Sequence, residues 1–193
     1  MNAERTFKKE LPRDKLLSIV LSYLKKIDKE HSKIKITKLL ETMTAEIVTA
    51  ETCRLWIVDH EKKTFFSETF PDDKRVEIPW GKGLLSKGLK EANAFYVNRV
   101  KEDKHYDASI DNIEDHAIKD IIILPVTDVT GKVLFIFEAA TAKRDLQQFT
   151  DNDLDTLRSI LPYLTDMYPI LLTDRSKKTD AHSDEDVKKT IAT

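Results

Sequence analysis

The segment from residue 76 to residue 140 limits what this chain can fold into more than any other part of it. It opens with Val76-Glu77-Ile78-Pro79, followed by Trp80-Gly81-Lys82-Gly83-Leu84-Leu85. Glycines on both sides of Lys82 permit the sharp change of direction needed between a strand and a helix. The segment closes with an apolar run at 121–126, a turn at 128–131 and a second apolar run from residue 133. It therefore predicts a strand, a helix and a buried pair of antiparallel strands.

Two amphipathic helices are predicted before this segment. Pro12 and Asp14 suit a helix start. Apolar residues then recur at heptad-like spacing, namely Leu17, Val20, Leu24 and Ile27. Such a stripe either packs on the core of its own domain or forms the seam of a dimer, and the sequence leaves both interpretations open. A second helix is predicted from the stripe Ile36, Leu39, Leu40, Met43, Ile47 and Val48, with Glu46 outside it and expected in solvent.

From Thr52 the apolar period shortens from about 3.6 to about 2 residues, which indicates β-strands. Strands are predicted at 52–58, 64–70 and 75–79, joined by short polar turns into an antiparallel meander. After the glycine turn, we expect further elements in a fixed order: a helix at 84–92, a strand at 95–97, a polar irregular segment at 98–119, and strands at 121–126 and 133–139.

A last helix is predicted from the apolar residues Leu154, Leu157, Ile160, Leu161 and Leu164. Thr150 and Asp153 resemble a capping box at its start. Pro162 is expected to kink or end this helix, because proline lacks the backbone donor, and Pro169 is expected to be a second break. We therefore divide the chain into a flexible N-terminus (1–11), one domain with flanking helices (12–172) and a disordered tail or linker (173–193).

Composition excludes several classes of protein. The 193 residues carry a formal net charge of −2, so no global field favours nucleic acid or an anionic membrane. The apolar runs are too short to span a bilayer, and the N-terminus lacks the apolar core of a signal peptide. Cys53 is the single cysteine, which rules out a disulfide framework or a cysteine-rich zinc site within one chain. We expect a cytoplasmic protein without a membrane or nucleic-acid partner.

The order of these elements, with four short motifs, resembles a GAF domain. Ile78-Pro79 through Leu85 is similar to the family's I-P-x-x-x-G-[IL]-x segment. Residues 98–106 resemble its N-[IV]-x-D-x-x-x-D-x-x-[FY] segment, with Tyr106 at the aromatic position. Residues 121–126 followed by Gly131-Lys132-Val133 resemble its central strand pair, and Phe149 to Asp153 resembles its closing F-[TS]-x-x-[DE]. The resemblance covers residues 34–164 and implies an α/β domain of the α+β type.

The resemblance also implies an arrangement and a class of function. An antiparallel sheet of about six strands would lie between helices, with the N- and C-terminal helices on one face as the dimer surface. The helix at 84–92 and the 98–120 segment, acting as a lid, would cover the other face, where the ligand would bind. Such modules sense small molecules in signal transduction and pass the state to an attached or associated output domain.

Departures from the family pattern bear on the ligand. Cyclic-nucleotide-binding members carry T-G-[FY]-x-[TS]-[KR]-[NS] before the central strand, whereas this chain has no Thr-Gly pair there and His116 falls at the aromatic position. Their N-K…F-x-x-x-D-E signature is half present, since Lys143, Phe149 and Asp153 fit. Cys53 lies on the first predicted strand, away from the region where bilin-binding members attach their chromophore. Members that reduce methionine sulfoxide need several cysteines, so the resemblance implies no such activity here.

We expect no enzyme, because neither a nucleophile elbow nor a pair of carboxylates set for acid–base work is evident in the sequence. The histidine and acidic residues of the 98–120 lid lack regular metal-ligand spacing, so a solvated lid is favoured over a metal site. No cofactor is required. The expected function is binding of a small ligand, a cyclic nucleotide being the best single candidate, with relay through the flanking helices of a homodimer. The alternative is a ligand-free dimerisation and relay module whose pocket is filled by its own side chains.

Six residues are the candidate ligand contacts: Trp80, Arg99, Tyr106, Asp111, His116 and Glu138. Five of them lie beside the glycine turn or in the lid, and Glu138 interrupts an otherwise apolar strand. Arg99 or helix-start amides would hold a phosphate, and Tyr106 would pack on a base. Four of them have a plain structural alternative: Trp80 as an anchor for its turn, Arg99 as surface charge, His116 as a structural histidine and Glu138 as an outward-facing side chain.

Overall fold

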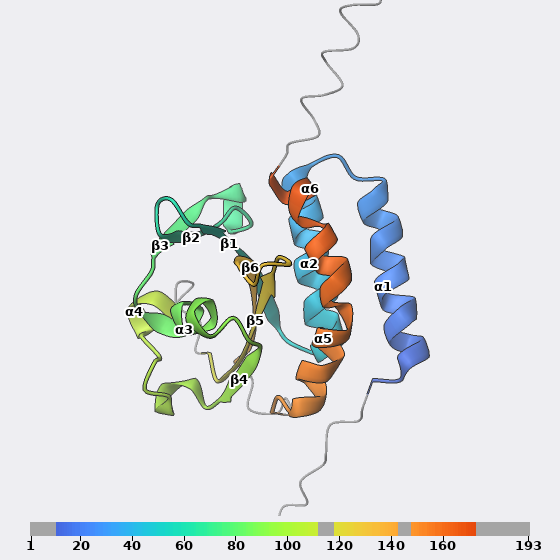
Figure 1. Cartoon of the computed structure of the whole chain (residues 1–193). Coiled ribbons are helices and arrows are strands. Elements are labelled where there is room, and N and C mark those ends of the chain that lie inside the picture. The colour runs from blue at the N-terminus through green and yellow to red at the C-terminus, as the bar shows by residue number, and fades with distance from the viewer. Residues whose placement is uncertain (1–10, 112–117, 143–147, 173–193) are drawn as a thin grey trace, which may run out of the picture.

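The chain is built on one six-stranded antiparallel sheet in the order β3-β2-β1-β6-β5-β4, with helices on both faces (Figure 1). The computed structural model describes residues 11–111, 118–142 and 148–172. The strands are β1 (Thr52–Asp59), β2 (Thr64–Ser67), β3 (Val76–Pro79), β4 (Phe95–Asn98), β5 (Asp120–Thr127) and β6 (Val133–Thr141). This sheet confirms the predicted fold class. The tail at 173–193 and the N-terminal residues 1–10 lie outside the described residues.

Two helical layers of unequal size cover the sheet. One layer contains α1 (Arg13–Asp28), α2 (Lys33–Val48), α5 (Asp151–Asp166) and α6 (Tyr168–Leu172). The other contains α3 (Gly83–Glu91) and α4 (Ala108–Asp111), with the 3-10 turn η2 (Val100–Glu102). Figure 1 shows α2 and α5 against the sheet and α1 outside them. Among the described helices, none combines the length and the apolar character needed to cross a bilayer.

Successive side chains of the central strands point to opposite faces of the sheet and so contribute to two separate cores. On β5, Ile122 and Leu124 belong to the cluster under α2 and α5, whereas Ile121 and Ile123 belong to the cluster under α3. β6 pairs with β5 on one side and β1 on the other, so it lies in the middle of the sheet. The continuous apolar run at 121–126 is therefore explained by burial of both faces of the sheet, as expected for a central strand.

The helix termini follow local rules, with one correction. At the start of α5, the Asp153 carboxylate accepts from the backbone N–H of Thr150 at 2.9 Å, which confirms the capping box. Pro162 does not end this helix, which runs on to Asp166. Pro162 lies on an exposed side of α5, where water can reach the carbonyl group that loses its donor. Pro169 lies in the first turn of α6, where a missing donor has no cost.

Most of the apolar stripe of α1 packs against other parts of the same chain. Val20 and Ile27 are buried together with Ile19 and Tyr23, and α1 packs against α2. The Tyr23 hydroxyl donates to the Glu46 carboxylate of α2 at 2.9 Å, so Glu46 is not simply solvated, as the sequence suggested. Leu17 remains 57% exposed. The stripe interpreted as a dimer seam is thus largely the contact between α1 and α2.

The buried carboxylate of Glu41 accepts a hydrogen bond from the part of β1 that does not pair with β2. β2 pairs with β1 only from Ile57 to Asp59, so the Leu55 N–H has no strand partner from β2. The Glu41 side chain of α2 fills the gap: its Oε1 accepts from Leu55 N at 2.8 Å and from Thr69 Oγ1 at 2.6 Å. Glu41 is 6% exposed, and burial raises the pKa of its carboxyl.

We predict that Glu41→Leu lowers the free energy of unfolding by about 1–3 kcal/mol, because it leaves two buried donors unpaired. Glu41→Gln should cost less, since an amide oxygen can accept both hydrogen bonds. A folded-state pKa raised above the unfolded value favours the neutral acid in the fold. Wild-type stability should therefore fall as pH rises from the ordinary glutamate pKa through the raised one, relative to Glu41→Gln. Urea unfolding of all three proteins over a pH series measures this difference, and parallel curves would contradict it.

Candidate functional site

The sheet face under α3 is mainly apolar and closely packed where the structure describes it. Leu84 and Leu85 of α3 are buried, with exposures of 0% and 2%, and lie in one cluster with Ile121, Ile123 and Ile136 of the sheet. Gly88 lets α3 approach closely, because a Cβ at this position would lie 2.5 Å from Ile123 Cγ2. The helix therefore rests directly on the strands.

One charged pair interrupts this apolar face. Arg54 of β1 and Glu138 of β6 are opposite each other in the antiparallel register, and both are half-buried. The Glu138 carboxylate accepts from the indole Nε1 of Trp56 at 2.6 Å. The Arg54 guanidinium donates to the carbonyl and hydroxyl oxygens of Thr69 at 2.9 and 3.0 Å.

Aromatic rings flank this pair. The Arg54 guanidinium carbon lies 4.1 Å from the centre of the Phe70 ring, a cation–π contact. Phe70 meets Trp56 edge to face, with ring centroids 5.7 Å apart. We call Arg54, Trp56, Thr69, Phe70 and Glu138 the sheet cluster. It unites a fixed positive charge and a carboxylate, both half-buried, with two buried rings on one side of the sheet, and the two charged groups are chemistry that can recognise a charged molecule.

Trp80 and Tyr106 come together elsewhere, on a groove along the outer side of α3. The groove encloses about 750 Å³ between this helix and residues 104–107, with Trp80 to Gly83 at one end. The Trp80 ring contacts Phe65 and His60, with centroids 6.1 and 5.4 Å away, and its buried Nε1 has no hydrogen-bond partner among the residues that the structure describes. Burial raises the pKa of the Tyr106 phenol.

Asp111 of α4 is hydrogen-bonded to the start of α3. Its Oδ1 accepts from the backbone N–H of Leu84 at 2.9 Å, in the first turn of α3, and its Oδ2 accepts from Asp107 N at 2.8 Å. Burial raises the pKa of this carboxyl. A Cβ on Gly83 would lie 2.6 Å from Asp111 Oδ1, and Gly83 has a φ of +78°, so only glycine fits this contact. Both carboxylate oxygens of Asp111 therefore accept hydrogen bonds from within the chain.

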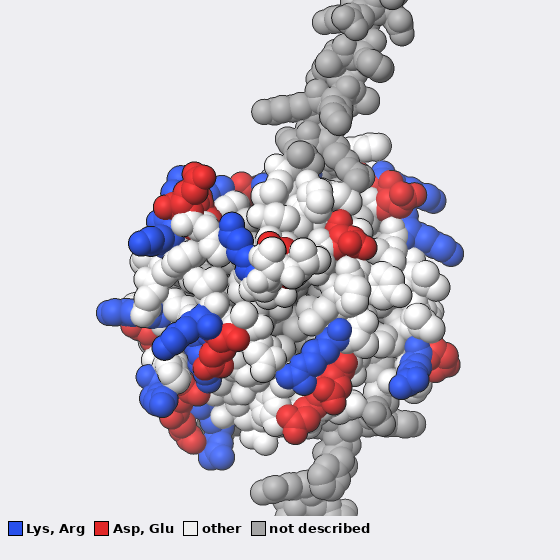
Figure 2. All heavy atoms as spheres, viewed as in Figure 1, with Lys and Arg blue, Asp and Glu red and all other residues white. Residues whose placement is uncertain are grey.

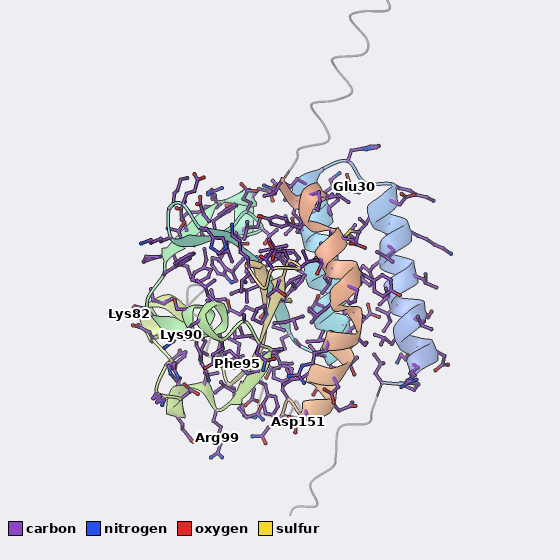
Figure 3. All side chains as sticks on the ribbon, in the orientation of Figure 1. Glu30, Lys82, Lys90, Phe95, Arg99 and Asp151 are labelled. Carbon is purple, nitrogen blue, oxygen red and sulfur yellow. The ribbon has the colours of Figure 1, made fainter. Side chains whose placement is uncertain are left out.

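Arg99 lies apart from both places. Its backbone is left-handed, with φ of 63°, and its N–H donates to the buried Asp120 at 2.9 Å. Its side chain is exposed and lies 3.4 Å from Glu102, beside a separate hollow of about 290 Å³. Figure 3 shows Arg99 well away from Lys82 and Lys90 of the groove. His116 lies outside the described residues.

The predicted contacts thus divide into distinct groups. Trp80 and Tyr106 share the α3 groove with Asp111 near its end, Glu138 belongs to the sheet cluster, and Arg99 lines its own hollow. Sequence reasoning missed Arg54 and Thr69. The period of two along β1 places Arg54 on the same face as Trp56, a signal that was available. The position of Thr69 depends on how the chain turns after β2, which periodicity does not describe.

Comparisons with known proteins agree with this architecture. No family model matches the chain. The dual 3′,5′-cyclic-AMP and -GMP phosphodiesterase 11A of Takifugu rubripes is 22% identical over 130 residues, a match that covers 61% of this chain and 14% of that protein. The chain therefore corresponds to a small part of that relative.

Two solved structures have a similar fold. The GAF domain of a phosphoenolpyruvate-protein phosphotransferase from Coxiella burnetii has a TM-score of 0.66 at 13% identity, over 78% of this chain and 90% of that one. Free methionine-R-sulfoxide reductase from Neisseria meningitidis, in complex with its substrate, has a TM-score of 0.64 at 13% identity, over 93% and 99%. At these identities the likeness concerns the fold, and the fold of this chain is that of GAF domains.

We predict that Gly83→Ala lowers stability by about 1–3 kcal/mol more than Gly131→Ala does, because only the first adds a clash to the backbone strain. Gly131 is the matched control: its φ is +84°, close to that of Gly83, but a Cβ there would meet nothing within 4 Å. Thermal and urea unfolding measure the difference. Equal losses in the two variants would show that the contact between Gly83 and Asp111 is not tight.

Proposed function

We propose that this chain, which has the fold of a GAF domain, is a non-catalytic sensory or regulatory module. In this proposal a small molecule binds at the sheet cluster, and binding biases the helical layer on the opposite face. The observation that carries the proposal is the Arg54–Glu138 pair on an otherwise apolar sheet face. Taking two charges even partly out of water has a cost before they interact. Hydrophobic side chains would pack there at lower cost, so a binding role explains their presence better than stability does.

A cyclic nucleotide is the ligand class that we favour. Its amino or imino groups would donate to Glu138 and its single phosphate charge would pair with Arg54, the two half-buried members of the sheet cluster, whereas the rings of Trp56 and Phe70 are buried beside them. Support comes from the phosphodiesterase relative, whose name specifies both cyclic nucleotides, over the matched 130 residues. The cytoplasmic location expected from the sequence remains part of this proposal.

A hydrogen-bonded chain connects the sheet cluster to the helical layer. Thr69 Oγ1 accepts from Arg54 at 3.0 Å and donates to Glu41 of α2 at 2.6 Å. A ligand that draws Arg54 away removes one partner of Thr69 and changes the hydrogen bond to Glu41. Because Glu41 also holds the backbone of Leu55, the change reaches both α2 and β1. This gives the ligand a route for biasing α2 and the helices packed on it.

The helical layer also offers a surface for a second copy. Leu17 and Leu21 of α1 are 57% and 54% exposed, and Tyr163 of α5 is 52% exposed. We propose that the homodimer forms through these exposed residues, not through Val20 and Ile27, which are buried against α2. Relay to an output domain or a partner signalling protein would then pass through this interface.

The absence of catalysis is likewise a proposal. The reductase with a similar fold acts on methionine sulfoxide, but this chain has one cysteine. Desolvation raises the pKa of the Cys53 thiol well above its ordinary value, which suppresses the reactive thiolate.

A ligand-free relay module is the second candidate. The direct contact of α3 with the sheet favours it, since Leu84, Leu85 and Ile123 fill the space between them with their own side chains. In this case the domain would serve dimerisation and transmit changes through rigid packing alone.

We predict that cyclic AMP or cyclic GMP raises the melting temperature of the chain, because a ligand that binds only the folded state stabilises it. Glu138→Gln should weaken binding roughly tenfold or more, the scale of one hydrogen bond to a charged group, while keeping an acceptor for Trp56. Glu77→Gln, on the exposed edge strand β3, is the matched control and should bind like wild type. Calorimetric titration gives the affinities. If neither nucleotide binds to the folded wild type, the ligand-free relay module becomes the conclusion.

We predict that Leu17→Lys combined with Leu21→Lys converts a dimer into a monomer, because both exposed side chains would lie at the interface. Val129→Lys, in the fully exposed turn after β5, is the control and should leave the assembly unchanged. Light scattering coupled to size-exclusion chromatography measures the mass. A dimer that persists in the double variant would place the interface on another surface.

A further inference from the structure

The groove along the outer side of α3 is a second place where the chain can hold a ligand. It is separate from the sheet cluster: none of the residues that line it belongs to that cluster. We propose that this α3 groove binds a nucleoside polyphosphate, with its lysines on the phosphates and its aromatic side chains on the base.

Positive charge is concentrated along this groove. Lys82, Lys87, Lys90 and Lys104 line it, against only two carboxylates, Glu91 and Asp107. The whole chain, in contrast, has slightly more acidic than basic residues. Figure 3 shows Lys82 and Lys90 on the α3 side of the molecule, and Figure 2 shows lysine and arginine side chains on that side with aspartate and glutamate side chains between them. Like charges that lie close together repel each other, so an anion that binds between them is favoured.

The two carboxylates do little to neutralise these lysines. Asp107 Oδ1 accepts from the N–H and the hydroxyl of Ser109, at 3.0 and 2.6 Å, and its Oδ2 lies 4.0 Å from Lys82. Among the described residues, no carboxylate forms an ion pair with Lys90 or Lys104. Both are exposed on the groove and available to an incoming anion. Compact ammonium groups on flexible stems suit phosphate oxygens, which lysine binds as a point charge.

The same groove has aromatic walls. Trp80 and Tyr106 line it, and both keep part of their surface in solvent. Stacking of a base on an aromatic side chain contributes about 1–3 kcal/mol and is tolerant of base identity. A volume of about 750 Å³ lies in the range of sites that hold a small organic ligand. Lysines alone would fit inorganic phosphate, but lysines beside rings in a groove of this size fit a nucleotide.

Several phosphates suit this charge better than one. The first turn of α3 is already occupied, since the Asp111 carboxylate accepts from Leu84 N, so the lysines must provide the anion contacts. They follow α3 from Lys82 to Lys90 and return on the opposite wall at Lys104. A row of cations of this length matches a chain of phosphates, whereas a cyclic nucleotide presents a single charge.

The test is calorimetric titration of the full chain at low ionic strength, without divalent cations, using ATP, inorganic tripolyphosphate and cyclic AMP. We expect ATP to bind about tenfold or more tightly than tripolyphosphate, because only ATP gains stacking. Tyr106→Ala should reduce affinity for ATP but not for tripolyphosphate, and Tyr106→Phe should bind like wild type. ATP binding should weaken as salt is raised, since the lysines are exposed.

Lys90→Glu combined with Lys104→Glu should weaken ATP binding at least tenfold and leave the melting temperature within a few degrees of wild type. The matched control is Lys74→Glu with Lys132→Glu, which makes the same change in net charge on exposed positions outside the groove. It should bind ATP within about twofold of wild type. Binding of cyclic AMP should be the same in both double variants, which separates this site from the sheet cluster.

Four results would overturn the inference. If ATP does not bind the folded wild type, the groove is not a nucleotide site. If ATP and tripolyphosphate bind equally, the aromatic walls make no contribution and the ligand is inorganic. If the two double variants lose affinity for ATP equally, the effect is one of net charge. If the groove variant loses affinity for cyclic AMP instead, the cyclic ligand occupies this groove.

Discussion

Burial of both faces of β5 and β6 is the constraint on which the rest of the structure depends. A strand pair with apolar side chains on both sides requires a covering layer on each side. The chain provides α2 and α5 for one face and α3 for the other. The two layers are consequently separated by the whole thickness of the sheet. A signal that starts on one face must pass around or through the strands to reach the other.

The two layers differ in how firmly they are attached. α3 is fixed near its start by the contact of Gly83 with Asp111 and near its end by the close approach of Gly88 to Ile123. Sliding this short helix would disturb both contacts, so it behaves as a rigid wall. α1, in contrast, rests on α2 and is the outermost helix of its layer. Mobility is therefore expected in the helical layer on the far side from the proposed ligand.

Local chemistry in the sequence determined much of this arrangement. The apolar run at 121–126 identified a central strand, the glycines at 81 and 83 identified the turn before α3, and Thr150 with Asp153 identified the start of α5. These predictions were correct because each depends on neighbours in the chain. Other features depend instead on contacts between parts of the chain that are far apart in the sequence. The side of α1 that meets α2 was left open by the sequence, the partner of Glu46 was missed, and of the two outcomes expected at Pro162, a kink or an end of the helix, the end did not occur.

The candidate site was only partly accessible to the same reasoning. Glu138 could be selected because a charge in an apolar strand is visible in the sequence, and Tyr106 because of its motif. Asp111 was assigned to a ligand because a conspicuous acidic residue in a polar segment gives no sign that a helix start will use it. Arg54 was missed because its importance comes from Glu138, more than eighty residues away in the chain and opposite it only through the register of β1 and β6.

The shortness of β2, which has half as many residues as β1, also bears on the tendency of the sheet to aggregate. A strand without a neighbour exposes a row of backbone groups on which another chain can add a strand. The first half of β1 would be such a row, but Glu41 and the turn at Thr69 cover it from within. The outer edges of the sheet are the four-residue strands β3 and β4, which are too short to hold a foreign strand firmly. The sheet therefore offers little template for aggregation, and this protection is provided by one buried carboxylate and by the shortness of the two edge strands.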